Sequence, residues 1–307
     1  VKRKDEIGIL SMSFRKMQIS IRNLIGELRH INQNLESKVV ERTEEIQKQK
    51  ELVEDKNKEI VDSINYALRL QQAILPPLDK VKTRLKQSFI LFKPKDIVSG
   101  DFYWMSEQED ELLIATVDCT GHGVPGALVS VVGANGLNRC VKEFGLKKPA
   151  EILDKLSEIV AETFETPEHE VKDGMDISLC SIHLKTKKLY YSGANNPLWI
   201  VRNKGKQVEE IKADKQPIGR YEFRKPFTDH KVDLEKGDCI YMFSDGYADQ
   251  FGGPGGKKFK YKALKELLVS VHENTMEEQK KALDDAFEKW KGNLMQIDDV
   301  CVIGIKI

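Results

Sequence analysis

The first sixty residues carry an apolar repeat that only a long helix can satisfy. The large apolar side chains there recur in alternating steps of three and four residues, at Ile7, Leu10, Phe14, Met17, Ile21, Leu24, Leu28, Ile31 and Leu35. Steps that average 3.5 residues keep one stripe of a helix facing a partner helix, as in a coiled coil. We therefore predict a helix that pairs with a second copy of the chain as a homodimer.

The repeat slips in phase after Leu35, because the next apolar step, to Val39, again spans four residues. Further on, only one position per heptad is apolar and charged residues fill the rest, which predicts a weaker, solvated helix. The segment 63–75 is more apolar and stops at Pro76-Pro77, which cannot continue a helix. We predict a signalling helix over 1–75, which controls a separate domain over 76–307 by helix rotation or by rearrangement of the dimer.

Downstream of the prolines, short apolar runs alternate with Gly, Asp and Asn. The runs predict strands at 88–92, 102–105, 112–117, 177–183, 189–192, 198–202, 239–243 and 300–305. Helical patterns lie at 126–144, 150–164, 260–272 and 276–291. Because the strands come as adjacent, hairpin-like runs, we predict an α+β domain with antiparallel sheets.

Charge and cysteine usage exclude several classes of protein. The 49 basic and 49 acidic residues balance, whereas a general polyanion binder carries a basic excess. No run approaches the roughly 18 to 20 apolar residues of a membrane helix, so we expect a soluble chain. The five cysteines are scattered without a CxxC pair, which predicts buried thiols and not disulfides or zinc.

Two aspartates lie at the ends of the first predicted hairpin. If the strands turn near Glu109-Asp110, the numbers of facing residues add up to about 219, which places Asp101 opposite Asp118. Neighbouring carboxylates without a basic partner share a proton or bind cations. Two ordinary turn aspartates remain the alternative reading of this pair.

The same pattern recurs near the C-terminus. Asp245 follows the strand 239–243, and Asp298-Asp299 precede the last strand, so an antiparallel pairing brings these carboxylates to one edge. Asp176, before another strand, either joins them or belongs to a turn. Oxygen-only ligands suit hard ions, so the sequence predicts two Mn²⁺ or Mg²⁺ ions and phosphoryl chemistry.

A glycine-rich turn follows Asp118, with the sequence Cys119-Thr120-Gly121-His122-Gly123-Val124-Pro125-Gly126. Glycines let the backbone fold tightly beside a ligand, and Pro125 suits the first turn of a helix. The helix start would favour an anionic group such as phosphate. His122 is a candidate catalytic proton donor to a leaving alkoxide, or it caps the turn.

Taken together, the motifs GDFYW, DCTGHGVPGAL, GANNPLWIV, FSDGYAD and DDVCVIGI resemble the bacterial metal-dependent Ser/Thr protein phosphatases of the 2C type. The resemblance is greatest to the branch of sporulation stage II protein E and the regulators of sigma-factor partner switching, and covers about 75–307. It implies a β-sandwich flanked by helices, in which a metal-bridging hydroxide attacks the phosphorus of phosphoserine or phosphothreonine.

The resemblance also implies roles for individual residues. Asp118 matches the aspartate that bridges both metals, and the other matching ligands are Asp101, the Cys119 carbonyl, Asp245 and Asp298, with Asp299 adjacent. The match departs after Asp118, because Cys119 and Thr120 precede the first glycine, which weakens the equation of His122 with a family general acid. Asn195-Asn196 replaces the Gly-Asp that helps hold a third metal in eukaryotic relatives, so we expect no strong third site.

The start of the chain is similar to the end of a HAMP signal-relay module, on the residues Asp5 to Leu10 with Phe14 and Met17. This implies the cytoplasmic part of a sensor anchored in the inner membrane through a missing upstream segment, with a plain dimerising coiled coil as the alternative. By resemblance the partner is a phosphorylated protein, an anti-sigma-factor antagonist. The rival function is a catalytically silent signalling scaffold with the same fold.

Overall fold

A computed structural model describes residues 5–108, 110–165 and 173–307. The chain forms two compact units, Val1–Ser63 and Ile64–Ile307. The helix α1 (Glu6–Ile74) ends one residue short of the proline pair, which confirms the predicted helix end to within one residue. The nine apolar side chains of the N-terminal repeat are all exposed to solvent in the single chain. Among the described residues, no helix combines the length and the apolar character that crossing a membrane requires.

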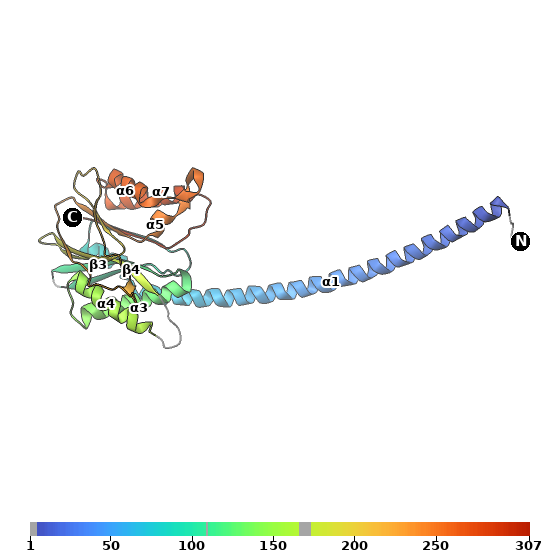
Figure 1. The fold of residues 1–307 in the computed structure, drawn as a ribbon, viewed down its shortest axis with the longest axis horizontal. Coiled ribbons are helices and arrows are strands. Elements are labelled where there is room, and N and C mark those ends of the chain that lie inside the picture. Colours follow the sequence, from blue (N-terminus) through green and yellow to red (C-terminus); the bar gives the residue numbers. More distant parts are fainter. Residues whose placement is uncertain (1–4, 109, 166–172) are drawn as a thin grey trace. The chain divides into compact units, whose positions relative to one another are not determined.

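The second unit contains two large antiparallel sheets (Figure 1) and a small two-stranded one. One has the strand order β1 (Ser88–Lys93), β13 (Val300–Lys306), β10 (Cys239–Phe243), β6 (Leu198–Val201) and β7 (Glu209–Ile211). The other has the order β2 (Phe102–Gln108), β3 (Glu111–Cys119), β4 (Gly174–His183), β5 (Lys188–Ala194) and β9 (His230–Asp233), and β8 (Ile218–Gly219) pairs with β4.

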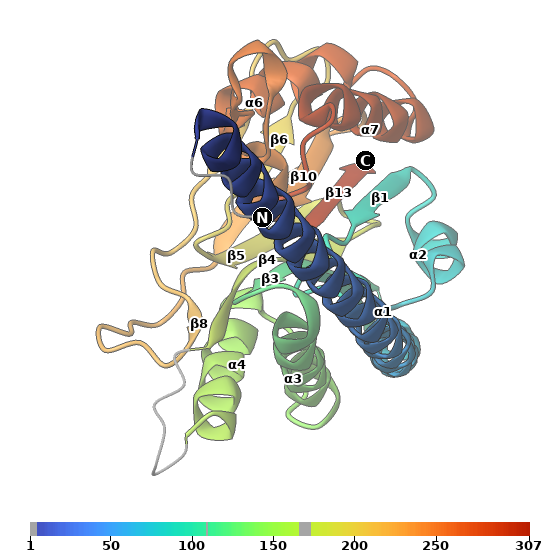
Figure 2. The same ribbon diagram turned by 90° about the vertical axis from the view of Figure 1, so that its right-hand side faces the viewer.

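Helices cover the outer face of each sheet, as both ribbon views show (Figures 1 and 2). The sheet of β2 to β5 is covered by α3 (Gly123–Lys142) and α4 (Pro149–Thr163), and the other by α6 (Lys260–Val271) and α7 (Met276–Lys291). The short elements are α2 (Leu78–Arg84), α5 (Gly246–Asp249), η1 (Gly253–Gly255) and the strands β11 (Phe251–Gly252) and β12 (Lys257–Lys258). This α+β sandwich confirms the predicted fold class.

Three clusters of buried apolar side chains hold the layers together. Leu137, Leu156 and Ile177 represent the cluster under α3 and α4. Ile114, Ile240 and their neighbours fill the space between the sheets, and Trp199, Tyr241, Leu283 and others pack under α6 and α7. All five cysteines are free and buried, as predicted. The apolar side chains of alternating strand positions therefore fix both sheets, and with them the strand ends that carry the carboxylates.

Candidate metal centre

The first hairpin has the predicted register. Phe102 faces Val117 where β2 pairs with β3, so that facing residue numbers add up to 219. Asp101 and Asp118 therefore flank the same end of the hairpin. On the other side of β3, Asp118 directly faces Asp176 of β4. Asp176 is thus a strand residue beside Asp118, and the alternative of an ordinary turn is wrong.

The second sheet supplies the remaining carboxylates. β10 and β13 are antiparallel, and their pairing continues past the end of β10, where Ser244 N donates to the Cys301 carbonyl and Cys301 N donates to Ser244 Oγ, both at 2.9 Å. Gly246 lies against the next stretch of chain so closely that a Cβ there would stand 2.0 Å from the Asp299 carbonyl oxygen. Only glycine allows this approach, which brings Asp245 and Asp298 together.

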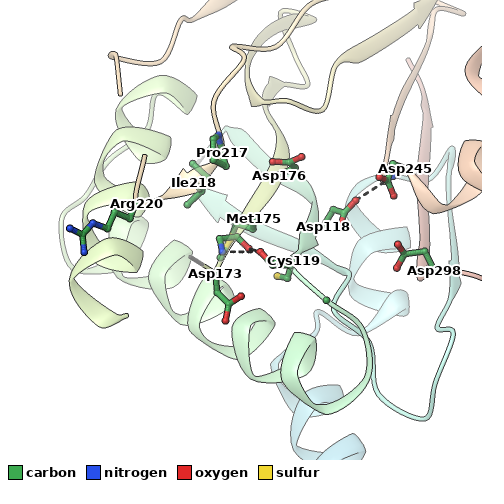
Figure 3. A pocket seen from close by; sticks show the side chains of 13 residues that line it. Asp118, Cys119, Asp173, Met175, Asp176, Pro217, Ile218, Arg220, Asp245 and Asp298 are labelled. Atoms are coloured by element: carbon green, nitrogen blue, oxygen red, sulfur yellow. Dashed lines mark hydrogen bonds between the residues drawn. The ribbon is translucent and has the colours of Figure 1, made fainter. Parts of the chain in front are cut away.

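These carboxylates surround one pocket of about 260 Å³ (Figure 3). Asp118, Asp176, Asp245 and Asp298 all line it, and the backbone N–H of Asp245 donates to Asp118 Oδ2 at 3.3 Å across the two sheets. In Figure 3 the Asp118 and Asp245 side chains approach each other with Asp298 beside them. The convergence of four separate chain segments confirms the predicted gathering of Asp118, Asp245 and Asp298 at one edge. Asp101 and Asp299 do not line this pocket.

Burial and neighbouring negative charge disfavour the ionised forms of Asp101, Asp118 and Asp245. Burial, followed by the neighbouring Asp245 charge, raises the pKa of Asp118 well above its usual value, and burial together with the charge of Asp118 does the same for the pKa of Asp101. Burial and the charge of Asp298 raise the pKa of Asp245 to about 6. The Asp101 Oδ2 atom is buried and has no hydrogen-bond donor among the described residues. An anionic oxygen in such surroundings is suited to a cation.

The predicted metal ligands differ in whether they face the pocket or bind the backbone. Cys119 lines the pocket, whereas both carboxylate oxygens of Asp299 accept backbone hydrogen bonds, from Lys95 N at 2.7 Å and from Gly100 N at 2.8 Å. Asp299 thereby clamps the segment that carries Asp101. As the described side chains lie, no three of His, Cys, Asp or Glu are close enough to hold one ion. The metal roles of these residues therefore stay predictions.

His122 lies at the start of α3 in a polar chain of its own. Its Nδ1 is 2.7 Å from Asp96 Oδ2, and its Nε2 is 2.8 Å from Lys95 Nζ. An ammonium group can only donate, so Nε2 accepts from Lys95 and Nδ1 donates to Asp96. Both ring nitrogens are thus engaged, and His122 does not line the pocket of Asp118.

Sequence reasoning missed several residues at this site. Asp173 and Arg220 line the pocket, although Figure 3 shows the Arg220 guanidinium turned away from the carboxylates. Gln71, near the end of α1, is only 4% exposed and makes three hydrogen bonds, to the Ser99 carbonyl at 2.6 Å, from the Ser99 N–H at 3.1 Å and to Ser130 Oγ at 3.0 Å. A pair of glutamines, Gln71-Gln72, in an apolar helix end is the only sequence signal for this contact.

The raised pKa values predict an unusual pH dependence of stability. A carboxyl whose pKa is higher in the folded than in the unfolded protein binds more protons when folded, so its contribution to stability is lost as pH rises. We expect the unfolding temperature of the chelator-treated protein to fall by a few degrees between about pH 4, the ordinary carboxyl value, and the value near 6 of Asp245. Differential scanning calorimetry with chelator or saturating Mn²⁺ checks this. The same slope in both samples would contradict it.

Comparison with known proteins identifies the family. Residues 108–307 match the model for Stage II sporulation protein E (SpoIIE). The chain is 27% identical over 197 residues to the phosphoserine phosphatase RsbU of Bacillus subtilis, covering 62% of this chain and 55% of RsbU, so it spans about half of that relative. The SiaA-PP2C domain of Pseudomonas aeruginosa matches with a TM-score of 0.74 and 30% identity, over 82% of this chain and 97% of that domain.

A second solved structure, the PP2C phosphatase domain of SpoIIE from Bacillus subtilis with a fragment of its regulatory domain, matches with a TM-score of 0.58. The identity is 21%, over 72% of this chain and 61% of that one, so this likeness speaks for the fold. The model match covers well over half of the chain, and the motifs predicted from the sequence lie on the strand ends of the PP2C fold. The chain therefore belongs to the SpoIIE family of PP2C-type phosphatases.

Proposed function

We propose that the chain is a protein phosphatase that hydrolyses phosphoserine and phosphothreonine with the help of Mn²⁺ or Mg²⁺. The observation that carries the proposal is the pocket in which Asp118, Asp176, Asp245 and Asp298 converge, with raised pKa values for the first three. Such a cluster is stable in its ionised form only beside cations. The names of two relatives, a phosphoserine phosphatase and a PP2C domain, support the same activity.

The chain's own residues would divide the work as follows. Two ions would be held by five groups, which are Asp101, Asp118, Asp245, Asp298 and the Cys119 carbonyl. Bound divalent ions supply a hydroxide-like nucleophile and neutralise charge on a phosphoryl group. Asp299 would keep the Asp101 segment in place through its bonds to Lys95 N and Gly100 N. The glycine turn at Gly121 leaves room for the phosphoryl group at the pocket rim.

The substrates that the protein hydrolyses distinguish a phosphatase from the rival function, a catalytically silent scaffold. We expect Mn²⁺-dependent phosphate release from phosphoserine and phosphothreonine peptides, and little from a phosphotyrosine peptide or from bis-p-nitrophenyl phosphate. A catalytically silent scaffold would release phosphate from none of them and would at most bind a phosphopeptide. A chain that cleaved only the diester would belong to a different class of metal-dependent phosphoesterase.

The catalytic role of His122 has a test that depends on the leaving group. A serine alkoxide needs a proton to leave, whereas p-nitrophenolate does not. If His122 supplies that proton, we expect His122→Asn to lower kcat for a phosphoserine peptide by about 100-fold and kcat for p-nitrophenyl phosphate by less than about threefold. Equal losses on both substrates would instead assign His122 to holding Lys95 and the turn.

For the N-terminal helix we propose dimerisation and signal relay. The exposed apolar repeat of Ile7 to Leu35 needs a partner helix, and a second copy of the chain offers the same stripe. The phosphatase would act on a phosphorylated anti-sigma-factor antagonist and respond to rotation of the helix. We also propose that it is the cytoplasmic part of an inner-membrane sensor. Sedimentation equilibrium of the chain and of Leu24→Asp, which places a charge in the stripe, tests the dimer.

A further inference from the structure

Three large apolar side chains stand exposed beside the carboxylate pocket. Met295 is 85% exposed and Leu294 50%, in the loop between α7 and β13, and Phe251, at the start of β11, is 40% exposed. The loop 292–297 contains no charged residue, although 32% of the chain is charged. Exposed apolar side chains that gather in one place mark interaction surfaces more often than scattered ones do.

The backbone under these side chains is held rigidly by one buried amide. The Gln250 side chain is fully buried, and its Nε2 donates both to the Phe251 carbonyl at 2.9 Å and to the Met295 carbonyl at 3.0 Å. Its Oε1 accepts from Ile297 N at 3.2 Å. Because one amide bridges both carbonyls, the backbones of Phe251 and Met295 lie within about 6 Å of each other.

A second glutamine anchors the same part of the loop. Gln296 Nε2 donates to the carbonyls of Lys93 at 2.7 Å and Asp298 at 2.8 Å. The loop is therefore ordered while its apolar side chains point to solvent. A surface that is ordered before binding loses little conformational entropy when a partner binds.

The position of the loop indicates which partner binds its apolar side chains. Met295 is three residues from Asp298, which lines the pocket, so their Cα atoms are at most about 10 Å apart. A protein that presents a phosphorylated side chain to Asp118 and Asp298 would therefore bind within reach of Met295. Three residues of an extended substrate peptide also span about 10 Å.

We propose that Leu294, Met295 and Phe251 form a docking surface for the phosphoprotein substrate. This apolar docking surface selects substrates that carry a large apolar side chain within about four residues of the phosphoserine. The inference rests on the proposed phosphatase function and adds to it a substrate preference that the metal site alone does not supply.

The test uses synthetic phosphoserine peptides in which a single Leu is moved through four positions on each side of the phosphoserine, in an Ala and Ser background. Phosphate release with Mn²⁺ is measured for the wild type and for Leu294→Gln/Met295→Gln, which keeps side-chain volume. Leu184→Gln is the matched control, because Leu184 is 41% exposed at the far end of β4, about 25 Å along the strand from Asp176. Turnover of p-nitrophenyl phosphate reports on the metal site alone.

We expect at least one Leu position to raise kcat/KM of the wild type about tenfold, as burial of one apolar side chain would. The double variant should lose that preference and keep its p-nitrophenyl phosphate turnover within about twofold, and Leu184→Gln should behave as the wild type. A wild type indifferent to Leu, or a double variant that keeps the preference, would overturn the docking surface. Wild-type protein inactive on p-nitrophenyl phosphate and on every peptide would overturn the phosphatase function itself.

Discussion

Asp118→Asn should lower Mn²⁺-dependent turnover of a phosphoserine peptide by at least about 1,000-fold. Asp118 lines the pocket, and its Oδ2 accepts a hydrogen bond from the Asp245 backbone N–H at 3.3 Å. An Asn side chain keeps the shape and loses the negative charge that would bridge two ions. Metal ions contribute several kcal/mol to transition-state stabilisation, at about 1.4 kcal/mol for each tenfold in rate. Steady-state phosphate release with saturating Mn²⁺ measures the loss.

The same substitution should stabilise the chelator-treated protein. Burial and the Asp245 charge both oppose ionisation of Asp118, and an amide removes that conflict. We expect the unfolding temperature to rise by about 3 °C, since sites shaped for function are seldom optimal for stability. Asp233→Asn, at an exposed position of β9, is the matched control and should change neither quantity. An Asp118→Asn protein that kept a tenth of the turnover, or unfolded earlier than the wild type, would contradict this view of the cluster.

Gln71→Ala should weaken the metal site from a distance. Gln71 pairs with both backbone groups of Ser99, two residues before Asp101, and with Ser130 of α3. Truncation leaves buried backbone groups of Ser99 without a partner, which costs about 2–4 kcal/mol, and loosens the segment that positions Asp101. Loss of such supporting contacts typically lowers metal affinity or activity about 10- to 100-fold. We expect the Mn²⁺ concentration at half-maximal turnover to rise by that factor.

The neighbouring glutamine provides the control. Gln72 is exposed and follows Gln71 on the same helix, so Gln72→Ala changes the helix equally but touches no hydrogen bond of Ser99. Excess Mn²⁺ should restore most of the turnover of Gln71→Ala if the defect is one of metal binding. Identical Mn²⁺ dependence in both variants would show that the end of α1 has no influence on the site, and would remove the basis for signal relay through the helix.

Much of the fold could be predicted because its signals are local. Pro76-Pro77 end a helix wherever they stand, and the residues between Asp101 and Asp118 fix the hairpin register through the position of its turn. Buried strands such as β10 and β13 are almost entirely apolar, so the sequence predicts both, with β13 ending one residue early. If these two strands are taken to be antiparallel, the sequence also predicts that Asp245 and Asp298 lie close together.

The rest depends on contacts that no local pattern encodes. The short edge strands β7 and β8 exist because neighbouring strands offer them hydrogen bonds, and the segment of Arg220 reaches the pocket only through the pairing of β8 with β4. The chain from Asp96 through His122 to Lys95 joins two turns that are 26 residues apart. Likewise, Gln71 and Gln250 are buried by tertiary packing, and as polar residues both looked like surface positions in the sequence.

The most direct test of the central claim is a Mn²⁺ titration of the chelator-treated protein, with phosphate release from a phosphoserine peptide followed at each metal concentration. The carboxylate cluster predicts no turnover without metal, a rise that saturates with Mn²⁺, loss on renewed chelation and recovery on readdition. Full turnover by the metal-stripped protein, unaffected by added Mn²⁺, would contradict the assignment of these aspartates to a metal centre.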